Sequence, residues 1–287
     1  MENYWALIRL WTRIGDDWGG SMMSRSEQPT GAAFFDLDKT ILATSSTIAL
    51  HRPFIDADLV TRRAAILSVL VHLPYLIKGA DEERMNAMAE SIGNLAKGIN
   101  APILESVVED SLDTVIDPVC YLGALAEIER HRAAGRPIVV ASASVIEMVR
   151  PIARRLGADE VLASIGQTDE HGDYTGRILH YNQAEGKASA CAALAAERGW
   201  DLSASWAYSD SVSDIPLLSS VGHPVAVNPD RGLKRAALDN EWEIMRFSDT
   251  ARVSRSLPVP SPRTLGIAAF SLGLIAAGVA FAVTRKR

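Results

Sequence analysis

The 287-residue sequence is poor in cysteine and has no surplus of basic residues. Its two cysteines, Cys120 and Cys191, lie far apart in apolar surroundings, and the sequence contains no CxxC pair or Cys/His cluster. These features argue against a structural zinc site and indicate two buried, reduced thiols. The formal net charge is −6, whereas sequence-independent nucleic-acid binding needs a basic surface. No nucleic-acid partner is therefore expected.

One long segment near the C-terminus lacks charge altogether. Residues 265–283 read LGIAAFSLGLIAAGVAFAV, and as a helix they would measure about 28 Å, close to the thickness of the hydrocarbon layer of a bilayer. We predict a transmembrane helix at 265–283, with a buried core helix as the alternative, and a proline-containing linker at 251–264. The protein would then lie in the cell membrane as a single-pass protein with the rest of the chain in the cytoplasm. Basic residues flank both ends of the segment, so charge alone does not set the orientation.

Residues 1–30 form a predicted N-terminal extension that lacks the apolar core of a signal peptide. Tyr4, Ile8, Trp11 and Trp18 recur at nearly helical intervals, which fits a short helix lying on a membrane surface. The alternative, which we favour, is a dangling segment that lies upstream of a native start at Met22 or Met23.

Strand and helix signals alternate through the rest of the chain. Strands are predicted at 33–35, 137–141, 205–208 and 224–227, a hairpin within 161–178, and helices at 145–156, 187–198 and 215–221. This alternation predicts an α/β fold with a doubly wound parallel sheet. Between the first two strands, apolar residues recur at helical spacing. We therefore predict a core of residues 31–44 and 133–250, with a helical cap of residues 45–132 over the carboxyl edge of the sheet.

The first predicted strand ends in two aspartates, within the sequence Ala-Phe-Phe-Asp-Leu-Asp-Lys-Thr at residues 33–40. Residues two apart on an extended chain share a side, so Asp36 and Asp38 can reach one point beyond the strand end. Ligands of open α/β sheets bind at that edge. One carboxylate could attack phosphorus while the other transfers protons. Taken alone, two nearby aspartates are more often a solvated turn.

Three further signals follow at predicted strand or helix ends. Ser142 comes directly after a strand and could hold a phosphate oxygen or simply cap the next helix. Lys187 opens a helix and could neutralise a phosphate or be a solvated lysine. Asp210 and Asp214 lie in a turn of small residues, where they could bind a hard divalent cation or serve as turn and cap residues.

The order of these signals is more specific than any one of them. A strand with DxDxT, a strand with Ser, then Lys, and a strand with DxxxD-Ile-Pro resembles the haloacid dehalogenase (HAD) superfamily of phosphohydrolases. The position of the cap, between the first two motifs, resembles that of the type I members. The sequences at 131–136, 140–144 and 226–230 look like subfamily IB, the phosphoserine phosphatase-like hydrolases. The resemblance covers roughly residues 31–250, and the hydrophobic tail is similar to that of actinobacterial members.

The resemblance implies a role for each motif residue. Asp36 would attack phosphorus to form an aspartyl-phosphate, and Asp38 would protonate the leaving alcohol and then activate water. Mg²⁺ would be held by the Asp36 carboxylate, the Asp38 backbone carbonyl and Asp210. Asp214 would orient a metal-bound water or Lys187.

The remaining motif residues would bind phosphate. Ser142 and Lys187 would stabilise charge on the phosphoryl oxygens, and Thr40 would fix the catalytic loop. The implied enzyme is thus a Mg²⁺-dependent phosphomonoesterase that acts on a phosphorylated small molecule or on a lipid or envelope phosphate at the membrane.

The sequence departs from authentic phosphoserine phosphatases at three places. Ser45 replaces a glutamate that meets the substrate amino group, Ser142-Ala143-Ser144 replaces Ser-Gly-Gly, and Ser209 replaces a glycine. No charged catalytic group is lost, but phosphoserine specificity becomes doubtful. Apolar stretches at 66–71 and 73–77 fit a lipid-sized pocket or ordinary cap core. A catalytically silent, membrane-tethered module that binds phosphate remains the alternative function. Substrate and oligomeric state are not predicted.

Overall fold

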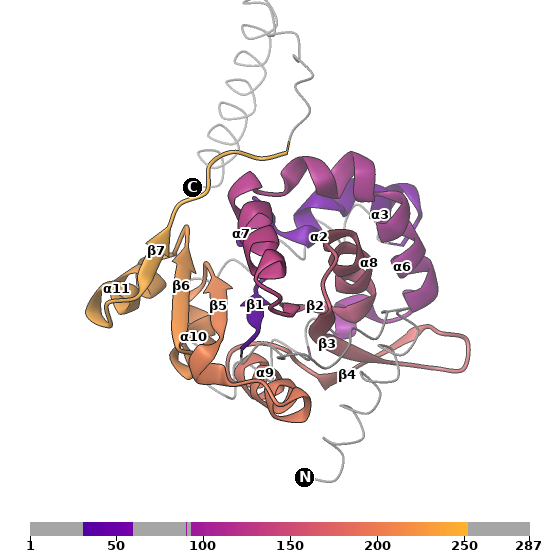
Figure 1. Cartoon of the computed structure of the whole chain (residues 1–287). Helices are drawn as coiled ribbons and strands as arrows, with labels where there is room; N and C mark the ends of the chain where they lie inside the picture. Colours follow the sequence, from indigo (N-terminus) through magenta and orange to yellow (C-terminus); the bar gives the residue numbers. More distant parts are fainter. Residues whose placement is uncertain (1–30, 60–89, 91–92, 252–287) are drawn as a thin grey trace, which may run out of the picture. The chain divides into compact units, whose positions relative to one another are not determined.

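A seven-stranded sheet runs through the part of the chain that the structure, a computed structural model, describes: residues 31–59, 90 and 93–251 (Figure 1). The strand order is β4-β3-β2-β1-β5-β6-β7. The strands are β1 (Ala33–Phe35), β2 (Ile138–Val145), β3 (Glu160–Thr168), β4 (Tyr174–His180), β5 (Trp206–Ser209), β6 (His223–Val227) and β7 (Glu243–Met245).

The sheet is parallel except at one edge, where β4 runs antiparallel to β3 as the second strand of the predicted hairpin. The first strand, β1, lies at its centre between β2 and β5, with Phe35 opposite Val140 and Tyr208. Chain order therefore reverses direction at β1. This position places the residues that follow β1 at the switch point of the sheet, where open α/β sheets bind ligands.

Helices cover both faces of the sheet (Figure 1). They are α2 (Ser46–Ala49), α3 (His51–Asp56), α6 (Ala101–Asp110), α7 (Leu122–Ala133), α8 (Ile146–Leu156), α9 (Glu185–Arg198), α10 (Ile215–Ser220) and α11 (Arg231–Asp239), with a π-helical turn at Leu112–Ile116. The predicted α/β class and the mostly parallel sheet are confirmed. We did not predict α11 or β7, because β7 is short and no part of it is fully buried.

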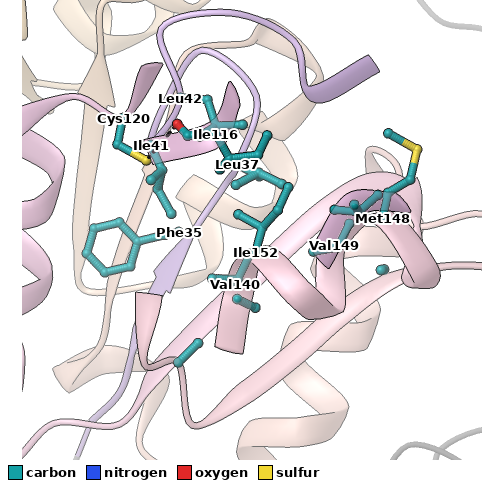
Figure 2. Packing of buried hydrophobic residues seen from close by; sticks show 14 of the residues in the cluster. Phe35, Leu37, Ile41, Leu42, Ile116, Cys120, Val140, Met148, Val149 and Ile152 are labelled. Carbon is teal, nitrogen blue, oxygen red and sulfur yellow. Dashed lines mark hydrogen bonds between the residues drawn. The ribbon is translucent and has the colours of Figure 1, made fainter. Parts of the chain in front are cut away.

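Successive residues of β1 point to opposite faces, and both faces are buried. Ala33 and Phe35 belong to a core cluster that includes side chains of α6, α7 and α8, whereas Ala32 and Phe34 belong to one that includes side chains of α9, α10 and α11. Figure 2 shows residues of the first cluster, among them Phe35 of β1, Val140 of β2, and Val149 and Ile152 of α8. Burial on both faces explains why the first strand reads as a continuous apolar run.

The predicted cap and the predicted membrane segment differ in how much of them the structure describes. Helix α7 lies within the predicted cap range 45–132, yet it supplies Ala124 and Ile128 to the core beside β1. Among the described residues, none of the helices has the length and apolar character needed to cross a bilayer. The predicted span 265–283, the linker 251–264 beyond Ala251, the extension 1–30 and the apolar cap stretches at 66–77 lie outside those residues.

A histidine is fully buried between α7 and the sheet. His131 Nε2 lies 2.8 Å from the Tyr208 hydroxyl, and its ring packs edge-on against Phe35. The Tyr208 hydroxyl also accepts a hydrogen bond from Arg130 and donates one to Glu127. Burial, reinforced by the positive charges of Arg130 and Arg136, lowers the pKa of His131 to about 4. The folded protein therefore keeps this ring neutral.

His131 should make stability fall with acidification. Its folded-state pKa of about 4 lies below the unfolded value of 6.5, so the unfolded chain binds the extra proton between these pH values. The free energy of unfolding should therefore lose about 2 to 3 kcal/mol between pH 7 and pH 4 through this group. Denaturant unfolding of the wild type and of His131→Gln across this range measures it. The difference between the two proteins should shrink as pH falls, and a pH-independent difference would contradict the prediction.

Candidate active site

The residues after β1 form a tight loop that carries both predicted catalytic aspartates. Asp36 is buried, and its backbone N–H donates to the Tyr208 carbonyl of β5 over 2.9 Å. Lys39 takes a left-handed conformation with φ of 62°, and the amides of Ile41 and Leu42 both bond the Leu37 carbonyl. The chain therefore turns back immediately, which holds the aspartates at the carboxyl edge of the sheet.

A buried ammonium group joins the first motif to the last. Lys187, near the start of α9, is 2% exposed, and its Nζ donates to Asp36 Oδ1 over 2.7 Å and to Asp214 Oδ2 over 2.8 Å. Isolated burial of a lysine is very costly, so this position requires both carboxylates. The structure thus places Lys187, Asp36 and Asp214 together.

Asp214 is fixed by a second donor that the sequence did not reveal. The Ser209 hydroxyl, at the end of β5, donates to Asp214 Oδ2 over 2.6 Å. The other oxygen, Oδ1, is buried and has no hydrogen-bond partner among the described residues. A buried carboxylate oxygen without a donor implies a ligand, water or metal-bound water at this point. Ser209, noted above only as a departure from glycine, therefore has a positioning role.

Asp210 follows β5, and its carboxylate receives no hydrogen bond from the described part of the chain. Its backbone carbonyl accepts from the Asp230 N–H over 2.8 Å. The Asp230 side chain accepts from Val212 N–H and caps α11 through Leu233 N–H. Asp230 thereby holds the loop that presents Asp210. The Asn-Pro-Asp sequence before a helix could have identified this cap from the sequence alone.

The carboxylates strongly perturb one another. Burial, with repulsion from Asp214 and Asp210, raises the pKa of Asp36 to about 8 despite the attraction of Lys187. Burial and the charge of Asp214 likewise raise the pKa of Asp210 to about 7, against the attraction of Lys39. The pKa of Lys187 is raised because Asp214 and Asp36 outweigh its loss of hydration. Negative charge is therefore in excess at this edge.

Asp38 is held by the first turn of α2. It is partly exposed, and its Oδ1 accepts the Ser46 backbone N–H over 2.8 Å. Partial burial raises the pKa of Asp38, while the hydrogen bonds from Ser46 and Ser45 act in the opposite direction. A carboxyl group that can hold or release a proton suits proton transfer. The sequence did not predict the part of Ser46.

Hydroxyl groups lie along the second half of β2, which continues to Val145 instead of ending at residue 141 as predicted. Ser142 is buried, and its hydroxyl accepts from the Ser144 backbone N–H over 3.2 Å. The Ser144 hydroxyl lies 3.3 Å from that of Ser46. The Thr40 hydroxyl donates to Asp36 Oδ2 over 3.3 Å, so Thr40 contacts the nucleophile candidate directly. Ser142 lies on β2, the strand beside β1. Because Val140 pairs with Phe35, Ser142 comes two residues after the partner of the last residue of β1.

The donor set suits a hard divalent cation. Asp36, Asp38, Asp210 and Asp214 bring four carboxyl groups, and Lys187 is the only buried cation among the described residues that bonds any of them. No group of three or more His, Cys, Asp or Glu side chains in the described ranges forms a ready metal cluster. The predicted metal ligands are fewer than such a cluster needs: the carboxylates of Asp36 and Asp210 and the backbone carbonyl of Asp38. Mg²⁺ is commonly bound in this way, through one or two carboxylates, waters and phosphate. The residues present therefore fit Mg²⁺.

Comparison with known proteins gives consistent results. The model of the haloacid dehalogenase-like hydrolases matches residues 33–219, well over half of the chain. A probable phosphatase of Mycobacterium tuberculosis is 40% identical over 257 residues, covering 89% of each chain. A Streptomyces azureus protein named for inhibition of morphological differentiation is 39% identical over 263 residues, covering 90% of this chain and 95% of its own.

A solved structure extends the likeness to the fold. This phosphoserine phosphatase, a phospho-aspartyl intermediate analogue, has a TM-score of 0.53 at 17% identity, covering 77% of this chain and 94% of its own. At that identity the likeness concerns the fold alone. The motif order, the sheet and the matched relatives all agree, and the chain belongs to the haloacid dehalogenase-like hydrolases, among relatives named as phosphatases.

Proposed function

We propose that the chain hydrolyses phosphomonoesters by transferring the phosphoryl group to Asp36. The observation that carries the proposal is the buried Asp36 carboxylate, fixed by Lys187 and Thr40 at the carboxyl end of the central strand. A carboxylate held in one orientation in a water-poor site is placed to attack phosphorus in line. The Lys187 ammonium beside it can also neutralise charge on the transferred group.

Two steps follow from the two aspartates. In the first, an Asp36 oxygen forms a bond to phosphorus, the bond from phosphorus to the ester oxygen breaks, and Asp38 gives its proton to that oxygen. In the second, Asp38 takes a proton from water, the water oxygen bonds to phosphorus, and the Asp36 carboxylate is released with inorganic phosphate. Asp38 therefore ends the cycle protonated, as it began.

Ser142, Lys187 and Thr40 would hold the phosphoryl oxygens and the loop during both steps. Mg²⁺, held by Asp36, Asp210 and the Asp38 carbonyl, would supply positive charge that offsets both the carboxylates and the phosphate dianion. Asp214 would keep Lys187 in place and use its unpartnered Oδ1 to orient a metal-bound water.

The substrate class has two candidates. One is a small, soluble phosphomonoester, and the other is a lipid or envelope phosphate met at a membrane through the predicted helix at 265–283. Ser45, which supports Asp38 through a neutral hydroxyl, offers no charge to a substrate ammonium group, so phosphoserine is disfavoured. A cytoplasmic body anchored in the cell membrane stays a proposal from the sequence. Flotation of the full chain with lipid vesicles would test it.

A catalytically silent phosphate-binding module is the alternative function. It predicts the loss or displacement of a charged group, whereas Asp36, Lys187 and Asp214 form a closed hydrogen-bonded set. The enzyme is therefore the better supported function.

Replacing the nucleophile should abolish turnover. We expect Asp36→Asn to lower phosphate release by roughly 10⁴-fold or more, because the amide cannot form the acyl phosphate. The assay uses the full chain with Mg²⁺ and p-nitrophenyl phosphate, phosphoserine, sugar phosphates and short-chain lysophosphatidate. Asp201→Asn, the same change in an exposed turn, is the matched control and should keep wild-type rates. Equal rates in both variants would contradict the proposal, and the preferred ester identifies the substrate class.

Mg²⁺ affinity should rise with pH. The pKa values of about 8 for Asp36 and about 7 for Asp210 mean that protons compete with the cation below these values. We expect binding to tighten by at least about tenfold between pH 6 and pH 8, and Asp210→Asn to weaken it at both. Isothermal titration with Mg²⁺ alone measures this. A pH-independent affinity, or full affinity in Asp210→Asn, would show that the cation binds elsewhere.

A further inference from the structure

The predicted phosphate-binding serine lies in a bulge of β2. Ala141 pairs with Leu162 of β3, but the next pair is Val145 with Ser164. Between these two pairs the chain moves on by four residues in β2 but by only two in β3. The extra residues of β2 therefore lie within 142–144. A bulge beside an active site redirects a side chain and interrupts the ladder of backbone hydrogen bonds.

Side chains replace the hydrogen bonds that the bulge removes. The Ser142 carbonyl accepts from Asn182 Nδ2 over 2.9 Å, and the Ala143 carbonyl accepts from the Ser164 hydroxyl over 2.6 Å. Buried backbone carbonyls need such partners, since an unpaired one is costly. The shape of the bulge therefore depends on Asn182 and Ser164.

Asn182 connects the two strands and is wholly buried. Its Nδ2 also donates to the Leu162 carbonyl of β3 over 3.1 Å, and its backbone N–H donates to the Ser164 hydroxyl over 3.0 Å. One side chain thus fixes β2 against β3 at the level of the phosphate-binding serine. No surface exposure or charge explains an asparagine at this position.

Asn182 also lies five residues before Lys187. The chain between them turns sharply at Ala184, which has a φ of 49°, and α9 then begins at Glu185. The neighbouring Gln183 donates to the Ser213 hydroxyl, beside Asp214. The same short segment therefore contacts the serine bulge, the helix that carries Lys187 and the loop that carries Asp214.

We infer that Asn182 is a positioning residue that sets Ser142 relative to Lys187 and so shapes the phosphate-binding site. The inference rests on the proposed function. Two observations carry it. The fully buried Asn182 amide bonds the Ser142 carbonyl, and Asn182 begins the short segment that leads to Lys187. Small shifts of groups that bind a transferred phosphoryl group have large effects on binding and rate.

Direct binding of inorganic phosphate tests this role without requiring turnover. Isothermal titration in saturating Mg²⁺ would compare the full-length wild type with Asn182→Ala and the milder Ser164→Ala. Asn100→Ala is the matched control, because Asn100 also bonds three partners but bridges α6 and the turn between β3 and β4. Circular dichroism confirms folding, and Mg²⁺ affinity is measured separately.

We expect phosphate affinity to fall by about tenfold in Asn182→Ala and by less in Ser164→Ala, with Mg²⁺ affinity unchanged and the Asn100→Ala control equal to wild type. Wild-type phosphate affinity in folded Asn182→Ala and Ser164→Ala would overturn the inference while leaving the proposed function intact. If Asn182→Ala does not fold, Ser164→Ala decides. A wild type that neither binds nor releases phosphate would overturn the proposed function and this inference together.

Discussion

The ammonium group of Lys187, buried between Asp36 and Asp214, is the interaction on which the site depends. It joins three segments that are distant in sequence: the end of β1, the start of α9 and the turn after β5. Removing it would leave two carboxylates facing each other in a water-poor environment, which is far more costly than losing an exposed ion pair. The fold can bury this charge because the sheet brings all three segments to one edge.

The ion pairs of Lys187 with Asp36 and Asp214 also explain why the site would need a cation in order to bind a phosphate. Lys187 bonds two carboxylates, and burial together with the charge of Asp214 still raises the pKa of Asp210. A phosphate dianion entering this edge would increase the surplus. A divalent cation held by Asp36 and Asp210 would offset the repulsion at both carboxylates. The surplus of negative charge would thus favour a cation directly, and a phosphate dianion only once a cation has offset that surplus.

The sequence predicted the parts of this arrangement that depend on local patterns. An apolar run that ends in Asp36 identified the central strand, and the order of Ser142, Lys187 and Asp210 placed the remaining motifs on its edge. Asn182 and Ser209 were beyond reach, because their roles depend on a register shift and on side-chain contacts across strands. Tertiary pairing, which no short sequence window records, decides both. The parts of the cap at 60–89 and the tail at 265–283 lie outside the described residues, so their predictions stay as they were.

In the proposed reaction, the groups that bind the phosphoryl group and the group that donates the proton are held by different parts of the chain. The phosphoryl group would be bound by Ser142 and Lys187, which are fixed by the sheet and by Asn182. The proton for the leaving group would come from Asp38, which is held by the backbone of Ser46, the first residue of α2. That helix leads into the region inserted between β1 and β2. In the proposed reaction, phosphoryl transfer would depend on residues held by the sheet, whereas the position of the acid would depend on the insertion. Changes in the insertion can then alter which alcohols leave well while the chemistry at phosphorus stays the same.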